Sequence, residues 1–287
     1  MHLDGHGKGI MEVSQRLIAS LKDRGVNATI RAVTKRLDRE IRIFADKRFD
    51  RRFGVDTRGI MDKEHLDISA AQKRGALHYE PTPVPAIQYM LKLLHLDYSE
   101  YTFIDYGSGK GRVLLLASVY PYKKIIGIEH SPLLHRSAVA NIRKWRNAEQ
   151  KCSDIESLCM DARDFMLPWG PLVLFFFSPF SPEVAGELFH KLQISLDDKL
   201  RPVHIFYYGG NPCFIEQLMN LGLSGYEIYS RRPFSAMDKY TGLLFSSDAD
   251  TISGRSHYAR LDMKKITCRK ENCDFRVRLN MSHKRAP

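Results

Sequence analysis

The sequence predicts an α/β fold in which a doubly wound, mostly parallel sheet of seven strands is covered by helices on both faces. Two observations predict it. Short apolar runs rich in β-branched and aromatic residues alternate along the chain with longer segments of helical periodicity. The apolar runs are also nearly continuous, which is typical of strands buried on both faces of a parallel sheet. The expected strands cover residues 102–105, 124–129, 157–161, 172–177, 203–208, 226–230 and 243–246.

Helices are expected in the segments that separate these strands, where apolar residues recur at helical spacing. They are placed at 111–119, 132–147, 182–195 and 212–221, with a short helix at 162–167. A further helix at 86–94 precedes the first strand and follows a segment that contains Pro81, Pro83 and Pro85. At 287 residues and 44% apolar, the chain is long enough for one large domain with additions or for two modest domains.

The pattern divides the chain into three parts. Residues 1–76 form a basic N-terminal extension, and apolar positions within 11–53 recur at helical spacing, so we expect two or three amphipathic helices there. The alternation of strands and helices defines a main domain at 77–254. Residues 255–287 are basic and lack a strong period, and we expect them to form an appendage.

The formal charge of +11 is concentrated in the two flanks. Residues 1–53 contain 13 Lys and Arg against 7 Asp and Glu, a charge of +6, and residues 255–287 contain 10 against 3, a charge of +7. The middle of the chain, 54–254, therefore carries −2. Basic flanks attract a nucleic acid, an anionic lipid surface or an acidic protein, although solubility alone also favours such charge.

Cysteine usage and hydropathy favour an intracellular, cytoplasmic protein. The five cysteines are odd in number and scattered, which argues against a disulfide framework and fits a reducing compartment. Only Cys268 and Cys273 lie close together, and one such pair supplies too few ligands for zinc, so no metal is expected. The longest apolar stretch, 172–177, is far shorter than the roughly 20 residues that cross a bilayer, and no apolar signal core begins the chain.

The most specific motif is a glycine-rich turn directly after the first expected strand. It reads Asp105-Tyr106-Gly107-Ser108-Gly109-Lys110-Gly111. Glycines at such a turn let the backbone approach a ligand closely and adopt positive φ angles. A nicotinamide dinucleotide fingerprint, Gly-x-Gly-x-x-Gly, would need its third glycine at Arg112, so the spacing disfavours a dinucleotide. A tight turn without any ligand is the simpler alternative.

This turn resembles the first motif of the class I S-adenosylmethionine-dependent methyltransferases, Asp-x-Gly-x-Gly-x-Gly. The resemblance implies a Rossmann-like enzyme that binds S-adenosyl-L-methionine through Asp105, Gly107, Ser108, Gly109 and Gly111. Glu129 ends the second expected strand, eighteen positions after Gly111. It matches the acid that the family places on the two ribose hydroxyls, a role that suits an ionised carboxylate.

The resemblance extends to three further places. Asp161 matches the acid that meets the adenine, and a cap of the next helix is the less favoured alternative. Ser178-Pro179-Phe180 follows the fourth strand, where the family carries a substrate-facing loop, and an ordinary turn is the alternative. Tyr79 to Thr82 resembles a segment that covers the methionine end of the cofactor, and it could instead dock the prolines on the core. The expected catalytic residues are therefore Tyr79, Ser178, Pro179 and Phe180, and Thr82 joins the cofactor-binding residues.

Methyl transfer from a sulfonium depends mainly on a dry and aligned acceptor. An amine acceptor must also lose a proton to a nearby acid–base group. Side chains near the strand ends that suit this role are Tyr79, Glu80, Tyr207 and Tyr208. Phe177 and Phe180 have ring faces suited to a cationic or planar acceptor.

Residues 77–208 most resemble the protein-lysine methyltransferases that lack a SET domain and their bacterial relatives. Three motifs carry this resemblance: the Gly-Ser-Gly-x-Gly-Arg turn, the Gly-x-Glu strand and the Pro-Thr segment. The resemblance implies methyl transfer to a protein lysine, and the basic flanks favour an acidic partner surface. Ser178 departs from the family's Asn or Asp. Because a hydroxyl cannot orient an amine as an amide does, this departure weighs against an amine as the acceptor. The alternatives are an RNA methyltransferase, less favoured without an RNA-binding module, a small-molecule methyltransferase, and a non-catalytic cofactor-binding scaffold.

Overall fold

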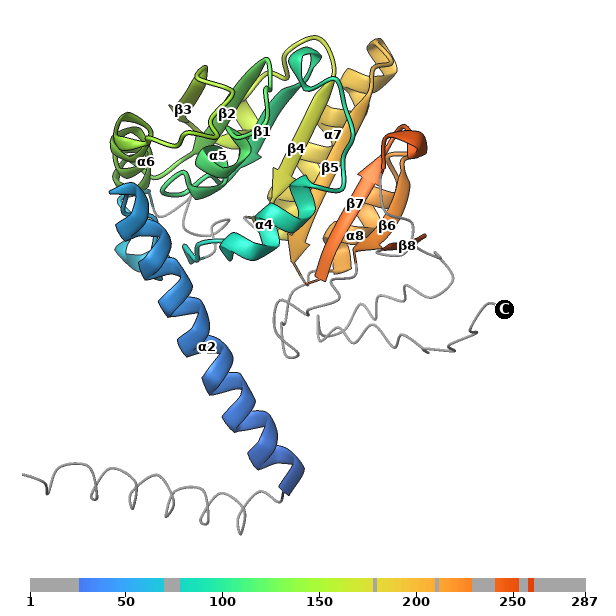
Figure 1. Ribbon diagram of the computed structural model, residues 1–287. Helices are drawn as coiled ribbons and strands as arrows, with labels where there is room; N and C mark the ends of the chain where they lie inside the picture. Colours follow the sequence, from blue (N-terminus) through green and yellow to red (C-terminus); the bar gives the residue numbers. More distant parts are fainter. Residues whose placement is uncertain are drawn as a thin grey trace, which may run out of the picture.

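The computed structural model describes residues 26–69, 78–177, 180–209, 212–228, 241–252 and 258–260. Within them, one sheet of eight strands with the order β3-β2-β1-β4-β5-β7-β6-β8 forms the centre of the molecule (Figure 1). The strands are β1 Thr102–Tyr106, β2 Lys124–Glu129, β3 Ile155–Cys159, β4 Leu172–Phe176, β5 Val203–Gly209, β6 Ser224–Ile228, β7 Thr241–Ser246 and β8 Tyr258–Arg260.

The strand directions confirm the predicted fold class. The strands β1 to β5 run parallel, and β7 lies antiparallel between β5 and β6. The first seven strands coincide with the expected ones to within a few residues. The eighth, β8, pairs antiparallel with β6 at the edge. It was not expected, because a strand of three residues is too short to carry a periodic pattern.

Helices cover both faces of this sheet, as the nearly continuous apolar runs indicated. Neighbouring residues of β1 enter separate cores, Phe103 on the face that carries the helices α4 and α5, and Ile104 on the face that carries α7 and α8. Both side chains are fully buried. The helices are α4 Val84–Leu91, α5 Arg112–Ala117, α6 Pro132–Lys144, α7 Pro182–Asp198 and α8 Pro212–Met219. The expected helix at 162–167 is only a 3-10 turn, η3 Ala162–Asp164.

The N-terminal extension is joined to the domain through the end of one long helix, α2 Val26–Phe53. Phe53 packs on Trp145 with ring centroids 4.5 Å apart, and Phe49 belongs to the core under α4 and α5. The remainder of α2 extends away from the domain (Figure 1). Two or three helices were expected within 11–53, and the part of that segment before residue 26 lies outside the described residues.

Residues after α2 also pack against the main domain. Val55 and Leu66 are buried, and Met61 exchanges backbone hydrogen bonds with Tyr79. Of the C-terminal appendage, the structure describes only 258–260, so Cys268 and Cys273 lie outside the described residues. None of the described helices has both the length and the apolar composition needed to cross a membrane.

Candidate functional site

The glycine turn connects β1 to α5 at the edge where the parallel strands end. Gly107, Gly109 and Gly111 have φ angles of 78°, 54° and 83°, which side chains other than glycine rarely adopt. The amides of Gly107 and Ser108 donate hydrogen bonds of 2.9 and 3.0 Å to the carbonyl of Ile128. These bonds hold the turn against the end of β2, which brings the two predicted acids to one place.

A close approach explains why Gly109 has no side chain. A β-carbon at this position would overlap the ring of Tyr79, which lies directly over the turn. The Tyr79 hydroxyl donates a 2.7 Å hydrogen bond to the carbonyl of Thr57. Burial raises the pKa of this phenol above its ordinary value. Tyr79 is therefore a half-buried wall of the site, and its hydroxyl is occupied by a backbone partner.

Asp105 and Glu129 are the two carboxylates at this turn, and both are almost completely buried. Glu129 accepts hydrogen bonds from the amides of Gly109 at 2.8 Å and Ser131 at 2.9 Å. Burial raises its pKa, while nearby His130 and these amides oppose the rise. For Asp105, burial raises the pKa well above the usual range, and the charge of Glu129 adds to the rise.

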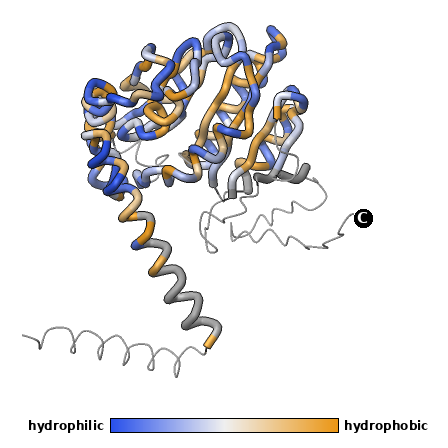
Figure 2. The backbone as a smooth tube through the Cα atoms, viewed as in Figure 1, coloured by the Kyte–Doolittle hydropathy of each residue, from blue (hydrophilic) through white to orange (hydrophobic). Residues whose placement is uncertain are grey.

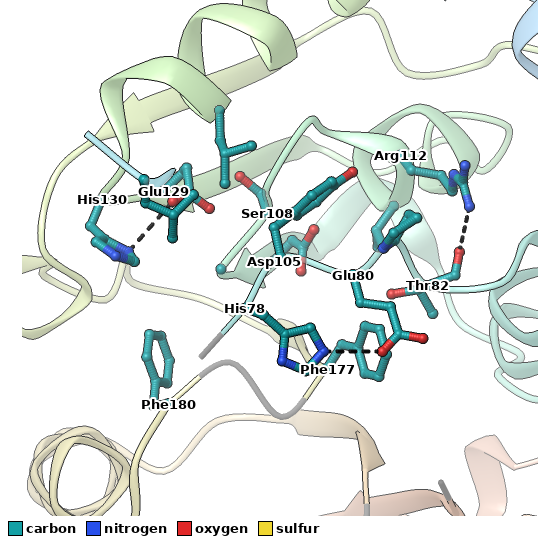
Figure 3. A pocket seen from close by; sticks show the side chains of 16 residues that line it. His78, Glu80, Thr82, Asp105, Ser108, Arg112, Glu129, His130, Phe177 and Phe180 are labelled. Carbon is teal, nitrogen blue, oxygen red and sulfur yellow. Dashed lines mark hydrogen bonds and ion pairs between the residues drawn. The ribbon is translucent and has the colours of Figure 1, made fainter. Parts of the chain in front are cut away.

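A pocket opens over these carboxylates (Figure 3). Several polar atoms on its wall are buried and have no hydrogen-bond partner within the described part of the chain: Asp105 Oδ2, Ser108 Oγ, Arg112 Nη2 and His130 Nε2. Buried polar groups are normally paired. Unpaired atoms that converge on a pocket therefore indicate a polar ligand.

The side of the pocket near Phe177 and Phe180 carries a histidine and a carboxylate. His78 Nε2 lies 3.3 Å from Glu80 Oε2, and their side chains are 41% and 23% exposed. Figure 3 shows this pair beside Phe177, with Phe180 farther along the opening. An imidazole held by a carboxylate is a common proton acceptor in enzymes.

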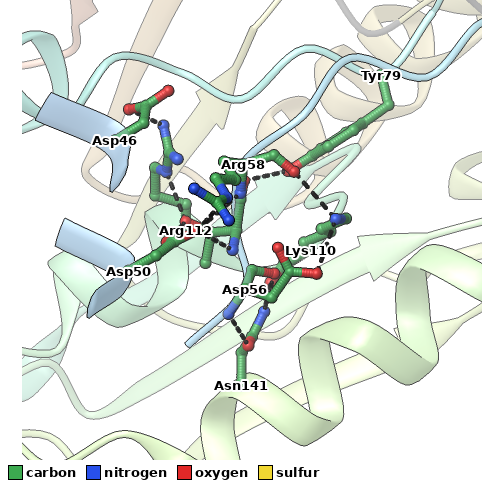
Figure 4. Close-up of polar contacts among 9 residues, drawn as sticks. Asp46, Asp50, Asp56, Arg58, Tyr79, Lys110, Arg112 and Asn141 are labelled. Atoms are coloured by element: carbon green, nitrogen blue, oxygen red, sulfur yellow. Dashed lines mark hydrogen bonds and ion pairs between the residues drawn. The ribbon is translucent and has the colours of Figure 1, made fainter. Parts of the chain in front are cut away.

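A second polar network fastens the N-terminal helix to the glycine turn (Figure 4). Arg112 donates to Asp46 at 2.7 Å, to Thr57 Oγ at 2.8 Å and to the carbonyl of Thr82 at 3.1 Å. Asp50 in turn accepts from the amide and the hydroxyl of Thr57. The end of α2 is thus part of the support of the turn.

Lys110 makes a further link between the turn and the segment after α2. It donates to Asp56 at 3.1 Å and to the carbonyl of Arg58 at 3.0 Å. Asn141 of α6 joins the same group, because its side-chain amide donates to the carbonyls of Asp56 and Lys110. The segment after α2 and the helix α6 therefore both bind the turn.

The predicted site residues divide by whether they line the pocket. Those that line it are Tyr79, Glu80, Thr82, Asp105, Gly107, Ser108, Glu129, Phe177 and Phe180. Gly109 and Gly111 belong to the same turn but are not among the lining residues. Asp161 does not line it: its carboxylate caps η3 and pairs with Arg163 at 2.8 Å, which is the capping alternative. Tyr207 and Tyr208 are fully buried within β5. Ser178 and Pro179 lie outside the described residues, so their roles stay predictions.

Three basic or imidazole side chains of the pocket wall were not anticipated: His78, Arg112 and His130. His130 directly follows Glu129 and lies 3.4 Å from its carboxylate. His78 precedes the Tyr79 to Thr82 segment by one position. Adjacency to a predicted site residue was the available signal for both. Arg112 stands where a dinucleotide fingerprint would have a glycine, so the spacing argument used its position and did not predict a role for its charge.

No family model and no curated protein matches the chain. Solved structures are similar to it. An RNA methyltransferase from Salinibacter ruber in complex with S-adenosyl-L-homocysteine is 19% identical, with a TM-score of 0.37, over 59% of this chain and 94% of the other. The geranyl diphosphate C-methyltransferase from Streptomyces coelicolor A3(2) is 11% identical, with a TM-score of 0.42, over 57% and 78%.

A third similar structure is the ribosomal protein L11 methylase from Lactobacillus delbrueckii subsp. bulgaricus. It is 17% identical, with a TM-score of 0.36, over 50% of this chain and 68% of the other. All three are named as methyl-transferring enzymes. Their names give three different acceptors.

Proposed function

We propose that the protein is an enzyme that transfers a methyl group from S-adenosyl-L-methionine to an amine, and that this amine belongs to a lysine side chain of a partner protein. The observation that carries the proposal is the buried carboxylate pair at the glycine turn, Asp105 and Glu129. Buried carboxylates that repel each other are costly unless a ligand supplies donors or positive charge.

The cofactor carries the groups that this site lacks. It has an ammonium group, a sulfonium and two ribose hydroxyls. Glu129 is oriented by the amides of Gly109 and Ser131, and its carboxylate is suited to accept from a ribose hydroxyl. The unpaired atoms Asp105 Oδ2 and Ser108 Oγ are suited to the cationic methionine end. When bound, the cofactor supplies an electrophilic methyl group.

The pair of His78 and Glu80 is suited to take the proton that an ammonium acceptor must lose. With His78 Nε2–H donating to Glu80, the other ring nitrogen, Nδ1, keeps a lone pair for the proton. The carboxylate then stabilises the imidazolium that forms. Tyr79 is less suited to this role, because its hydroxyl is bound to the carbonyl of Thr57.

The aromatic and acidic groups at the opening favour a cationic side chain as the acceptor. The rings of Phe177 and Phe180 attract a cation through their faces, and Glu80 adds a negative charge beside them. The three similar structures do not select among acceptors, because they are named for RNA, geranyl diphosphate and a ribosomal protein. The choice of lysine rests on this lining and on the resemblance of the sequence.

Calorimetric titration with S-adenosylmethionine and S-adenosylhomocysteine tests the cofactor, with NAD as the control ligand. We expect micromolar binding of the first two and none of NAD. Glu129→Gln should weaken the binding of both by at least tenfold, about 1.4 kcal/mol, because it removes a charge-assisted hydrogen bond. Glu156→Gln is the matched control, since that carboxylate is half exposed and pairs with Lys124 at the sheet edge.

Transfer of a radiolabelled methyl group tests the acceptor. The labelled cofactor is incubated with the protein and with either lysate proteins or RNA, and labelled protein is hydrolysed to identify the modified amino acid. Methyl-lysine supports the proposal. Label in RNA alone would show that the acceptor is a nucleic acid and not lysine. Binding of the cofactor without transfer to any substrate would favour a non-catalytic cofactor-binding scaffold.

A further inference from the structure

Helix α2 extends away from the domain (Figure 1), and hydrophobic positions recur along this part of it (Figure 2). Leu37, Ile41 and Phe44 are 57%, 64% and 68% exposed. Steps of four and three residues place them in one line along the helix. In the sequence, Val33 and Ile30 continue the same spacing toward the amino end. A line of exposed apolar residues is typical of an interaction surface.

This apolar line, Leu37, Ile41 and Phe44, lies opposite the face that attaches α2 to the domain. The attaching residues include Asp46, Asp50 and Phe53, which contact Arg112, Thr57 and Trp145 respectively. Each of the three lies nine residues after one member of the apolar line. Nine residues make two and a half helical turns. The domain therefore leaves the apolar line uncovered.

Arginines continue the apolar line toward the domain. Arg48 and Arg51 follow Phe44 at steps of four and three residues, and both are exposed. The helix as a whole contains nine Lys and Arg against four Asp and Glu, a net charge of +5. An apolar line combined with an excess of basic residues is typical of helices that lie on anionic bilayers.

We propose that α2 binds the surface of an anionic phospholipid bilayer. Leu37, Ile41 and Phe44 enter the boundary between headgroups and acyl chains, while Arg48 and Arg51 meet the anionic headgroups. A second copy of the chain also suits an apolar line of this spacing. In a parallel pair of helices, however, Arg48 and Arg51 of one chain would face the same arginines of the other chain and repel them. Anionic headgroups instead neutralise this charge.

The direction of α2 relates this surface to the pocket. In Figure 1 the helix leaves the domain on the side toward which the arrows of β4 and β5 point. The pocket also lies at the carboxyl ends of the strands, at Asp105 and Glu129. The helix that carries the apolar line therefore leaves the domain on the side where the pocket opens.

Co-sedimentation of the full chain with phospholipid vesicles tests the proposal. We expect binding to vesicles of phosphatidylglycerol and phosphatidylcholine, weaker binding to phosphatidylcholine alone, and a decrease with salt. The variant Leu37→Ser/Ile41→Ser/Phe44→Ser should bind at least tenfold more weakly. The matched control, Ile60→Ser/Ile194→Ser/Leu200→Ser, changes three other exposed apolar residues, 66%, 54% and 90% exposed, and should bind within twofold of the wild type.

A second variant separates charge from apolar contact. Arg48→Ser/Arg51→Ser keeps the apolar line and should lose the preference for anionic over neutral vesicles. Equal melting temperatures for all variants exclude unfolding as the cause. Absence of wild-type binding to anionic vesicles, or an equal loss in the control variant, would overturn the proposal. A different result would also overturn it: sedimentation velocity shows a dimer for the wild type and a monomer for the apolar-line variant, and neither of these two proteins binds vesicles.

Discussion

Arg112 donates a hydrogen bond of 2.7 Å to Asp46, and the two side chains are only 2% and 19% exposed. Arg112 begins the helix after the glycine turn, whereas Asp46 belongs to α2 of the N-terminal extension. The bond therefore ties the turn to a segment 66 residues earlier in the chain. The extension is part of what holds the candidate site in shape.

We expect Arg112→Met to lower the free energy of unfolding by about 3 kcal/mol, because it removes one partner of a buried ion pair. Arg163→Met is the control: the side chains of Arg163 and its partner Asp161 are 39% and 22% exposed, so the loss of this pair should cost about 1 kcal/mol or less. Urea unfolding measures both. If the pair is the cause, the loss in the double variant Asp46→Ala/Arg112→Met will be smaller than the sum of the two single losses. Additive losses would contradict it.

The approach of Tyr79 to Gly109 gives a second prediction. Gly109→Ala should destabilise the fold by about 2 kcal/mol more than Gly54→Ala, because only the first inserts a β-carbon into a ring. The two glycines have similar φ angles, 54° and 66°, so the backbone strain is matched. Adding Tyr79→Ala should recover much of the extra loss. Equal effects of the two alanine variants in urea unfolding would show that the turn tolerates a side chain.

The central sheet and the glycine turn could be predicted because their signals are local in the sequence. Each strand of the sheet centre is a nearly continuous apolar run, and the turn joins an acid to three glycines within seven residues. Glu129 could be placed because it matches the acid that ends the second strand in the family the sequence resembles, and in the structure that strand end lies beside the end of β1. Such patterns can be recognised in the sequence without any knowledge of contacts between distant residues.

The remaining parts of the site depend on contacts between distant segments or on residue types with more than one use. No spacing rule connects Arg112 with Asp46, since their contact depends on how α2 docks. His78 and His130 are single histidines, and only the pocket brings them together. Asp161 follows a strand as a cofactor ligand would, but an aspartate there also caps a helix, and its contact with Arg163 became visible only in the fold.

The proposed proton acceptor yields a prediction that separates chemistry from binding. His78→Asn should reduce methyl transfer at least hundredfold, because an amide cannot accept the proton of the acceptor. It should leave the affinity for S-adenosylhomocysteine within about twofold. His95→Asn, a change of an exposed histidine that does not line the pocket, is the control. Unchanged transfer by His78→Asn at saturating cofactor would assign proton removal to another group or to solvent.

The raised pKa of Asp105 predicts that stability and binding respond in opposite directions to one substitution. Burial, and then the charge of Glu129, raises this pKa well above its ordinary value of 3.8 in the folded chain. The contribution of Asp105 to stability is therefore fully present below that ordinary value and is lost as the pH rises through the raised pKa. Asp105→Asn removes the titration while keeping the shape of the side chain.

Without ligand, Asp105→Asn should consequently be more stable than the wild type at pH 7.5, and the difference should shrink toward pH 4. The same variant should bind S-adenosylmethionine at least tenfold more weakly, because the carboxylate that meets a cationic ligand is gone. Urea unfolding at several pH values, together with calorimetric titration, measures both effects. A variant that is less stable at neutral pH and binds as tightly as the wild type would show that Asp105 serves the fold instead of a ligand.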